Sequence, residues 1–402
     1  MKKRIFISMH YMEIGGAERA LLGLLNAIDT SIVDVDLFIN QHTGAFMKLI
    51  PDKINLLPEM RGYNAIERPL KQILIEGQFK IAFARLKAKI KYRQYIRKNK
   101  LEHKEEGSGS HYIMDEVIPY LPSLYYLGEY DLAIAFLDPP HIIQKKVLAR
   151  KRIEWIHTDW GTIITDYSKL YHWWADNDYI ASISPEITKS FLKAFPGLDD
   201  KIVLIENILS PRMVIEQSNA CRAKEMEGNN GVTLLSIGRI TYQKNFEIIP
   251  YVCRCLIDKG INNFKWFILG QGNHEEIDKT VIKLKVEDYV IFLGARENPY
   301  PYINACDIYL QPSRYEGKSV TVREAQILQK PVIITNYPTS SSQITHRLDG
   351  IISEMAPKEI ANAIIELLQD TDLKDHIISY LQNHDYGNES EINKLYQIIG
   401  RR

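Results

Sequence analysis

The chain has 402 residues, of which 45% are hydrophobic and 25% are charged, as in ordinary soluble globular proteins. Its 50 Lys and Arg residues balance 50 Asp and Glu residues, which excludes a globally basic nucleic-acid-binding protein. The length predicts two domains, and no stretch approaches the roughly 20 apolar residues that a membrane-spanning helix needs.

The start of the chain and its cysteines favour a cytoplasmic protein. Met1–Arg4 is positively charged, but the apolar run behind it, Ile5–Met9, is too short for a signal peptide and predicts a first strand. Four cysteines occur, all in the second half and without a Cys-x-x-Cys pair, which is typical of reduced thiols in a cytosol.

Short apolar runs alternate with longer amphipathic segments in the first half of the chain. The runs predict strands at Arg4–Met9, Val33–Asn40, Asp131–Leu137, Arg152–Ile156, Tyr179–Ser182 and Val203–Ile205. The other segments predict helices at Ala17–Ile28, Pro69–Arg97 and Pro185–Ala194, the second long enough to be interrupted. A polar stretch with two glycines, Glu102–His111, is expected to be a loop.

The second half repeats this alternation. Strands are predicted at Val232–Ile237, Lys265–Leu269, Val290–Leu293, Ile308–Leu310, Val332–Thr335 and Gly350–Ser353. Helices are predicted at Phe246–Asp258, Asn273–Leu284, Thr321–Leu328 and Pro357–Gln369.

The pattern as a whole predicts an α/β protein with two doubly wound domains, each a parallel sheet covered by helices on both faces. The boundary is expected near Asn207–Pro211. A polar stretch, Glu216–Gly231, reads as an exposed loop and is the alternative boundary.

Two glycines, Gly15 and Gly16, follow the first strand and open the first helix. Glycine lets a backbone approach a ligand closely, and a helix start offers free N–H groups to an anion. A tight strand-to-helix turn explains the pair equally well.

Two cations follow the strand Val232–Ile237. Arg239 comes directly after Gly238, and Lys244 lies five residues further on. Arg grips phosphate oxygens with two donors and Lys adds a point charge, so the pair suits a diphosphate. Taken alone, two solvated cations in a loop are the more ordinary explanation.

A later segment, Ser313–Glu324, carries two carboxylates and runs from a strand into a helix. Glu316, beside Gly317, is suited to accept hydrogen bonds from sugar hydroxyls. The N–H groups of Lys318, Ser319 and Val320 are expected to face a phosphate at the helix start. Glu324 has an alternative explanation, because Thr321 and Glu324 fit a capping box.

A histidine, His157, stands just past the strand Arg152–Ile156. It is suited to bind a substrate hydroxyl or to transfer a proton. A hydrogen-bonded histidine at a domain surface is the alternative.

A basic segment, Lys80–Lys104, carries ten Lys and Arg residues and one acid, Glu102. Phe79, Phe83, Leu86 and Ile90 recur at helical spacing and form one apolar stripe. Such a helix suits an anionic membrane surface. The alternative is a domain helix with a solvated charged face.

Together these motifs resemble the retaining glycosyltransferases of family 4, which have the GT-B fold. The resemblance spans nearly the whole chain, and the segment Ile308–Thr335, with seven residues between its two glutamates, is its most specific part. The motifs follow one another in this order: Gly15-Gly16-Ala17-Glu18-Arg19, His157, Gly238-Arg239 with Lys244, Gly270-Gln271-Gly272, and Glu316 with Glu324.

The resemblance implies two Rossmann-like domains that face each other across a cleft. Residues 1–207 are then the acceptor-binding domain, 208–385 bind the nucleotide-sugar, and a terminal helix within 386–402 packs back on the first domain. Arg239 and Lys244 hold the donor diphosphate, Glu316 the donor sugar and Glu324 the ribose. Gly16 lies near the diphosphate or the acceptor, and His157 contacts the donor sugar near the reaction centre.

The implied activity is transfer of a hexose from a nucleotide-sugar, chosen here as a UDP-sugar, to a glycan or lipid-linked glycan in cell-surface polysaccharide synthesis. The anomeric configuration is retained and no metal or cofactor is expected; no cluster has metal-ligand spacing. Lys318 departs from the family, in which an apolar residue often follows Glu-Gly, and it leaves open which sugar is held.

Two other functions fit the same domains. A nucleotide-sugar 2-epimerase needs no acceptor, and a non-catalytic partner subunit needs no turnover. The expected location is the cytoplasm, with peripheral attachment to the inner face of the membrane if Lys80–Lys104 binds lipid.

Overall fold

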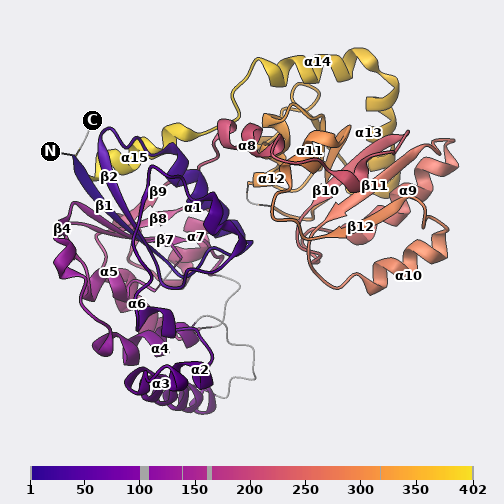
Figure 1. Cartoon of the computed structure of the whole chain (residues 1–402). Helices are drawn as coiled ribbons and strands as arrows, with labels where there is room; N and C mark the ends of the chain where they lie inside the picture. The colour runs from indigo at the N-terminus through magenta and orange to yellow at the C-terminus, as the bar shows by residue number, and fades with distance from the viewer. Residues whose placement is uncertain (1, 100–107, 138, 161–164, 317, 401–402) are drawn as a thin grey trace. The chain divides into compact units, whose positions relative to one another are not determined.

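The computed structural model describes residues 2–99, 108–137, 139–160, 165–316 and 318–400 (Figure 1). The chain divides into two compact units, Met1–Ile208 with Glu389–Arg402 and Leu209–Asn388. The chain thus passes between units at 208/209 and 388/389, beside the expected limits at 207/208 and 385/386.

The first unit is built on a seven-stranded parallel sheet in the order β3-β2-β1-β5-β7-β8-β9. Its strands are β1 (Lys3–Met9), β2 (Val33–Ile39), β3 (Asn55–Leu56), β5 (Leu132–Ala135), β7 (Arg152–Ile156), β8 (Tyr179–Ser182) and β9 (Ile202–Leu204). A small separate sheet pairs β4 (Glu129–Tyr130) with β6 (Leu148–Ala149). The helices are α1 (Gly16–Ala27), α2 (Leu70–Ile75), α3 (Phe79–Lys98), α4 (Ser108–Val117), α5 (His141–Lys145), α6 (Tyr167–Ala175) and α7 (Pro185–Ala194), together with α15 (Ile392–Ile398) from the end of the chain.

The second unit has a six-stranded parallel sheet in the order β12-β11-β10-β13-β14-β15. Its strands are β10 (Val232–Ile237), β11 (Phe264–Leu269), β12 (Val290–Gly294), β13 (Ile308–Gln311), β14 (Val332–Thr335) and β15 (Ile351–Ser353). Its helices are α8 (Pro211–Ser218), α9 (Ile249–Asp258), α10 (Glu275–Leu284), α11 (Tyr300–Ala305), α12 (Val320–Ile327), α13 (Pro357–Gln369) and α14 (Thr371–Gln382).

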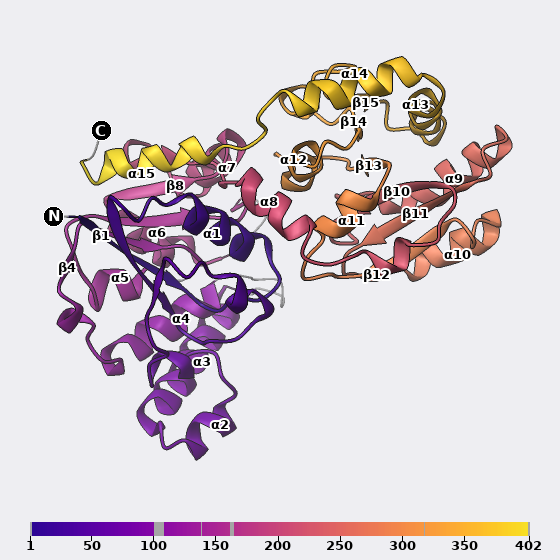
Figure 2. The same ribbon diagram turned by 45° about the horizontal axis from the view of Figure 1, so that its top comes forward.

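Helices cover both faces of the second sheet, which is why its strands are mostly apolar (Figures 1 and 2). One buried cluster joins the sheet to α9, α10, α13 and α14 through residues such as Trp266, Val252 and Ile364. Another lies among the sheet, α8, α11 and α12, with Val214 and Val322 as members. The two layers hold the strand ends in place.

The last helix, α15, belongs to the first unit. The backbone N–H of Asp29 donates to the Tyr396 hydroxyl at 2.8 Å, and Lys151 Nζ donates to the Ile398 carbonyl at 2.7 Å. These bonds tie the end of the chain to residues 367 and 247 positions earlier.

The predicted strands with long apolar runs are confirmed, and so is the interruption in Pro69–Arg97. The chain turns between α2 and α3 at Gly77, whose φ is +72°. The terminal residues of most elements shift by one or two positions, as expected for frayed ends.

Both predicted polar loops are wrong in part. Residues 102–107 lie outside the described part of the chain, but Ser108–His111 begin α4, because Met114 and Val117 pack in the core beside α3. Residues 216–218 end α8, a helix that Pro211 starts and the Ser210 side chain caps by accepting from the Met213 N–H at 3.4 Å.

Candidate active site

The winding of the second unit reverses between β10 and β13. From β10 the chain proceeds to β11 and β12 at one edge, whereas β13 leads to β14 and β15 at the other edge, and β10 and β13 themselves pair side by side. In open α/β sheets, ligands bind outside the carboxyl ends of the strands at this reversal. The segments that leave these two ends carry Arg239, Lys244 and Glu316.

Glycines let the loops beyond β10 and β11 lie against each other. A Cβ on Gly270 would stand 1.8 Å from the Gly238 carbonyl oxygen, and one on Gly272 would stand 2.6 Å from that of Ile240. A Cβ on Gly238 would also crowd the Lys244 side chain, 3.0 Å away. Gly238 therefore leaves the space through which Lys244 extends.

Lys244 and Glu316 form an ion pair, with 2.6 Å between Nζ and Oε1. Oε1 also accepts from Ser313 Oγ at 2.7 Å and from Gln311 Nε2 at 3.3 Å, and Oε2 accepts from Gln243 Nε2 at 3.4 Å. The Glu316 side chain is only 7% exposed. The carboxylate is thus held in one orientation by donors from the loop after β10, from β13 and from the loop after β13.

Arg239 differs from Lys244 because it is exposed. It makes no ion pair or side-chain hydrogen bond with the described residues. An anion at this edge would therefore meet one cation that is open to solvent and one that is already committed to Glu316. Lys318 is likewise exposed, and Gly317 lies outside the described residues.

Glu324 is fully buried on α12, where Oε1 accepts from the Tyr300 hydroxyl at 3.0 Å. The capping-box explanation for Glu324 is wrong, because α12 starts at Val320 with Ser319 as its N-cap and no side-chain capping bond. Thr321 Oγ1 instead donates to Gln311 Oε1 at 3.2 Å. Glu324 thus lies in the second turn of α12 and does not cap the helix.

The amide at the start of α12 is not open. The Ser319 N–H donates to Gln343 Oε1 at 3.1 Å, and Gln343 Nε2 donates back to the Ser319 carbonyl at 2.6 Å. The expectation that this N–H faces a phosphate is not met in this state, since the Gln343 side chain would first have to move. Val320 is 37% exposed.

Gly16 and His157 lie in the first unit, at the carboxyl ends of β1 and β7, with β5 between those strands. Gly16 is exposed, and a Cβ added there would meet nothing within 4 Å. At Gly15, by contrast, a Cβ would stand 2.1 Å from Glu18 Oε2. The Glu18 carboxylate is the far end of a flexible side chain that can turn aside, so packing strictly requires a glycine at neither position.

His157 lies beside Phe136 and Trp155, with ring centroids 4.5 and 6.3 Å away. Burial lowers its pKa to about 3, although a hydrogen bond with the Phe136 backbone opposes the shift. Nε2 is buried and has no hydrogen-bond partner among the described residues. The ring is neutral at pH 7, which favours hydrogen bonding to a hydroxyl over the transfer of a proton.

Acid is expected to destabilise the fold through its histidines. Burial also lowers the pKa of His111 to about 3. Between pH 6.5 and 3 the unfolded chain binds protons at His157 and His111 that the folded chain does not. The free energy of unfolding therefore decreases as the pH is lowered through this window and is unaffected by these groups above it. Each group contributes at most about 1.4 kcal/mol per pH unit.

Urea unfolding at pH 7.5 and 5.5 measures this loss. His157→Gln removes one titrating group, and the variant should therefore lose less stability between the two pH values than the wild type. An unchanged loss would show that His157 keeps an ordinary pKa.

Several polar residues of this site were not predicted. Tyr309, Gln311 and Ser313 alternate along β13 and beyond its end, and the Tyr309 hydroxyl donates to Gln311 Oε1 at 2.8 Å. This period-two polar row was a usable sequence signal. Tyr300 and Gln343 come from elements far along the chain and carried no local signal. The described residues hold no group of three or more His, Cys, Asp or Glu side chains placed to bind a metal.

Comparison with known proteins defines the class of the second unit. Residues 218–384 match the family model described as glycosyl transferases group 1. The segment covers β10 to β15 and so contains Arg239, Lys244, Glu316 and Glu324. The second unit is therefore similar to the group 1 glycosyltransferase domains.

Individual proteins of similar sequence are named as glycosyltransferases or as a glycolipid synthase. The alpha-monoglucosyldiacylglycerol synthase of Streptococcus pneumoniae is 28% identical over 206 residues, covering 48% of this chain and 46% of that protein. The capsular polysaccharide biosynthesis glycosyltransferase CapM of Staphylococcus aureus is 26% identical over 152 residues, covering 37% and 40%. An uncharacterized glycosyltransferase of Methanocaldococcus jannaschii is 26% identical over 185 residues, 45% of each chain. The match spans less than half the length of each of these relatives.

Solved structures match over the whole chain. Anabaena HepE in complex with UDP-glucose superposes with a TM-score of 0.66 at 16% identity and covers 98% of both chains. TarM of S. aureus gives 0.67 at 13% identity, covering 100% of this chain and 99% of the other. The protein has the GT-B fold, with one parallel-sheet domain in each unit, as the sequence predicts.

Proposed function

We propose that the chain is a retaining glycosyltransferase that moves a sugar from a UDP-sugar to a glycan or lipid-linked glycan acceptor. The group 1 domain and the named activities of relatives in capsule and glycolipid synthesis support this function. HepE, solved with UDP-glucose, has the same fold and makes uridine the first nucleotide to test.

The observation that carries the proposal is the Lys244–Glu316 pair beside the exposed Arg239, at the reversal of the second sheet. A nucleotide-sugar presents a diphosphate and several hydroxyls side by side. Two cations next to an oriented carboxylate match that combination.

Each residue then has a role. Arg239 and Lys244 neutralise the diphosphate, Glu316 accepts hydrogen bonds from the donor sugar, and Glu324 binds the ribose with Tyr300 orienting its carboxylate. In the first unit, which we propose binds the acceptor, Gly16 lets its backbone approach the ligand. The neutral ring of His157 contacts the sugar.

The proposed step is a same-face substitution without metal. The bond between the anomeric carbon and the diphosphate oxygen breaks as the acceptor oxygen bonds to that carbon from the same side. The acceptor proton passes to the departing phosphate, and Arg239 and Lys244 stabilise its charge. Transfer should consequently survive EDTA.

A thermal-shift screen of UDP-, GDP- and ADP-sugars tests the donor. A nucleotide at 100 times its Kd stabilises the folded state by about 2.7 kcal/mol and raises Tm. NMR of the product then tests the mechanism, since an α-linked product from an α-linked donor shows retention. Epimer formation without acceptor would instead indicate the 2-epimerase, and binding without turnover on a broad acceptor panel a partner subunit.

Gly16→Ala is expected to separate stability from activity. The new methyl group has open space, so Tm should stay the same or rise slightly. Transfer should fall about tenfold or more if a ligand must approach this backbone. Gly23→Ala is the packing control, because its Cβ would stand 1.9 Å from the Ile208 carbonyl oxygen and should lower Tm. Wild-type transfer by Gly16→Ala would remove Gly16 from the site.

A further inference from the structure

Helix α3 has two apolar faces, and only one of them is covered. Ile81, Ala82, Ala84 and Ala88 are buried, the first three in the core that also holds Met114 and Val117 of α4. The predicted stripe points the other way: Phe79 is 66% exposed, Phe83 66%, Leu86 46% and Ile90 57%. Helix α3 is therefore a domain helix with a solvated charged face, as the alternative explanation has it, but the apolar stripe lies on the solvated side and not in the core.

Cations border this exposed stripe on both sides. Helix α3 contains eight Lys and Arg residues and no Asp or Glu. At 100° per residue, Lys80 and Lys87 fall on one side of the stripe and Lys89 and Arg93 on the other. Lys87 pairs with Glu116 at 2.7 Å, whereas Lys80, Lys89 and Arg93 form no ion pair with the described residues.

A neighbouring element extends the apolar surface. Helix α2 packs against α3, and both lie together at one end of the first unit in the two views (Figures 1 and 2). Ile75 is 77% exposed and Leu74 43%. Among the described residues no helix is both long and apolar enough to cross a bilayer, so this surface could only lie on one.

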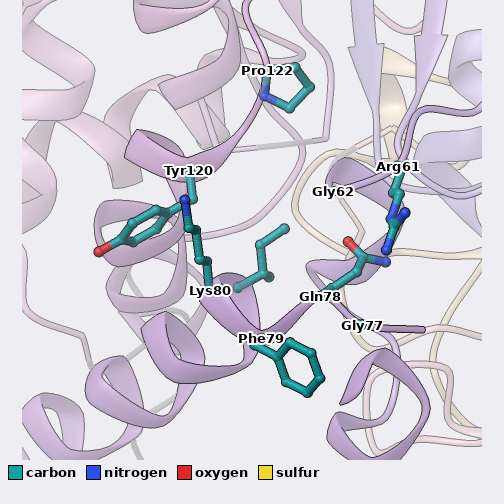
Figure 3. A pocket seen from close by; sticks show the side chains of 9 residues that line it. Arg61, Gly62, Gly77, Gln78, Phe79, Lys80, Tyr120 and Pro122 are labelled. Atoms are coloured by element: carbon teal, nitrogen blue, oxygen red, sulfur yellow. The ribbon is translucent and has the colours of Figure 1, made fainter. Parts of the chain in front are cut away.

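A pocket of about 450 Å³ opens at the N-terminal end of α3 (Figure 3). Arg61, Lys80 and Tyr120 supply polar groups to its lining, and Phe79, the first residue of the stripe, also borders it. The pocket includes no residue of the candidate donor site. It places two cations and a hydroxyl next to the exposed apolar stripe.

We propose that α2 and α3 dock on an anionic phospholipid bilayer, with the pocket holding one phosphate headgroup. The stripe enters the boundary between headgroups and acyl chains while the flanking cations meet anionic lipid. A second copy of this chain is a poor occupant, because pairing like faces would bring Lys80, Lys89 and Arg93 of each copy together, and α3 carries no acid to pair with them.

Co-sedimentation with vesicles tests the docking in the absence of donor and acceptor, so its failure would leave the proposed transfer untouched. Wild-type protein should bind vesicles of phosphatidylcholine with 30% phosphatidylglycerol, much less to phosphatidylcholine alone, and weakly in 1 M salt. Phe79→Ser with Phe83→Ser should lower the affinity by roughly tenfold or more without changing Tm, since both side chains are exposed.

Ile282→Ser on α10 is the matched control, an exposed apolar residue in the second unit that should change nothing. Lys80 and Lys98 lie at the same angle on α3, 18 residues apart, so Lys80→Gln should weaken binding several-fold more than Lys98→Gln if the pocket holds a headgroup. Equal effects of the two lysine substitutions would show that the pocket does not hold a headgroup. Equal binding by the stripe variant and wild type, or a wild-type dimer that the stripe variant dissociates, would overturn the docking.

Discussion

Glu316→Gln should lower kcat/KM for glycosyl transfer by about 10²–10³-fold with every active donor. The substitution keeps the shape of the side chain and removes its charge. It therefore weakens two things at once: the acceptor for sugar hydroxyls and the partner that orients Lys244, 2.6 Å away. Because Lys244 is partly exposed and can turn to water, the fold should lose little stability.

Steady-state kinetics with the donor found in the screen measures this loss. Glu225→Gln is the control, since Glu225 also forms an ion pair, with Arg296 at 2.7 Å, but lies outside the candidate site. Transfer near the wild-type rate in Glu316→Gln would refute the role given to Glu316.

Arg239→Ala and Lys244→Met should both abolish most transfer, by about 10²–10³-fold, but they should differ in stability. Arg239 is exposed and unpaired among the described residues, so its loss should leave Tm unchanged while the shift caused by UDP disappears. Lys244→Met leaves the buried Glu316 carboxylate without its cation and should cost about 1–3 kcal/mol, softened by the three neutral donors that remain.

Urea unfolding and a UDP thermal shift on the two variants measure these effects together. Lys279→Met, on the exposed face of α10, is the control for loss of a surface lysine. A fully retained UDP shift in Arg239→Ala would show that the diphosphate binds elsewhere.

The positions of the strands along the chain were predictable because buried parallel strands leave long apolar runs. Both β10 and β13 stand where the sequence places them, and the residues just past their ends therefore meet at one edge. Spacing along the chain, however, says nothing of which side chains touch. The Lys244–Glu316 pair spans 72 residues and became visible only in three dimensions.

Short helices were the main omission. Helix α6 is rich in aromatic residues and reads like a strand, yet Asp166 caps it by accepting from the Lys169 N–H at 3.2 Å, and Leu170 and Trp174 are buried one turn apart. Tertiary packing overrode the local preference there. The sequence also could not show which apolar face of α3 is buried, because the helix has two.

The glutamates show where motif reasoning misleads. Thr321 and Glu324 fit a capping box by spacing, but the helix begins two residues earlier than that box requires. Burial of Glu324 against Tyr300 reflects a constraint from α11, which no local pattern records.

A nucleotide-sugar is expected to bind where β10 and β13 end. Hydrogen–deuterium exchange with and without UDP, or the nucleotide that raises Tm, measures this directly. Protection should appear in residues 238–245 and 312–324 of the second unit and be absent from α10. Protection confined to the pocket at the start of α3, or none in either loop, would show that the nucleotide does not bind at the ends of β10 and β13.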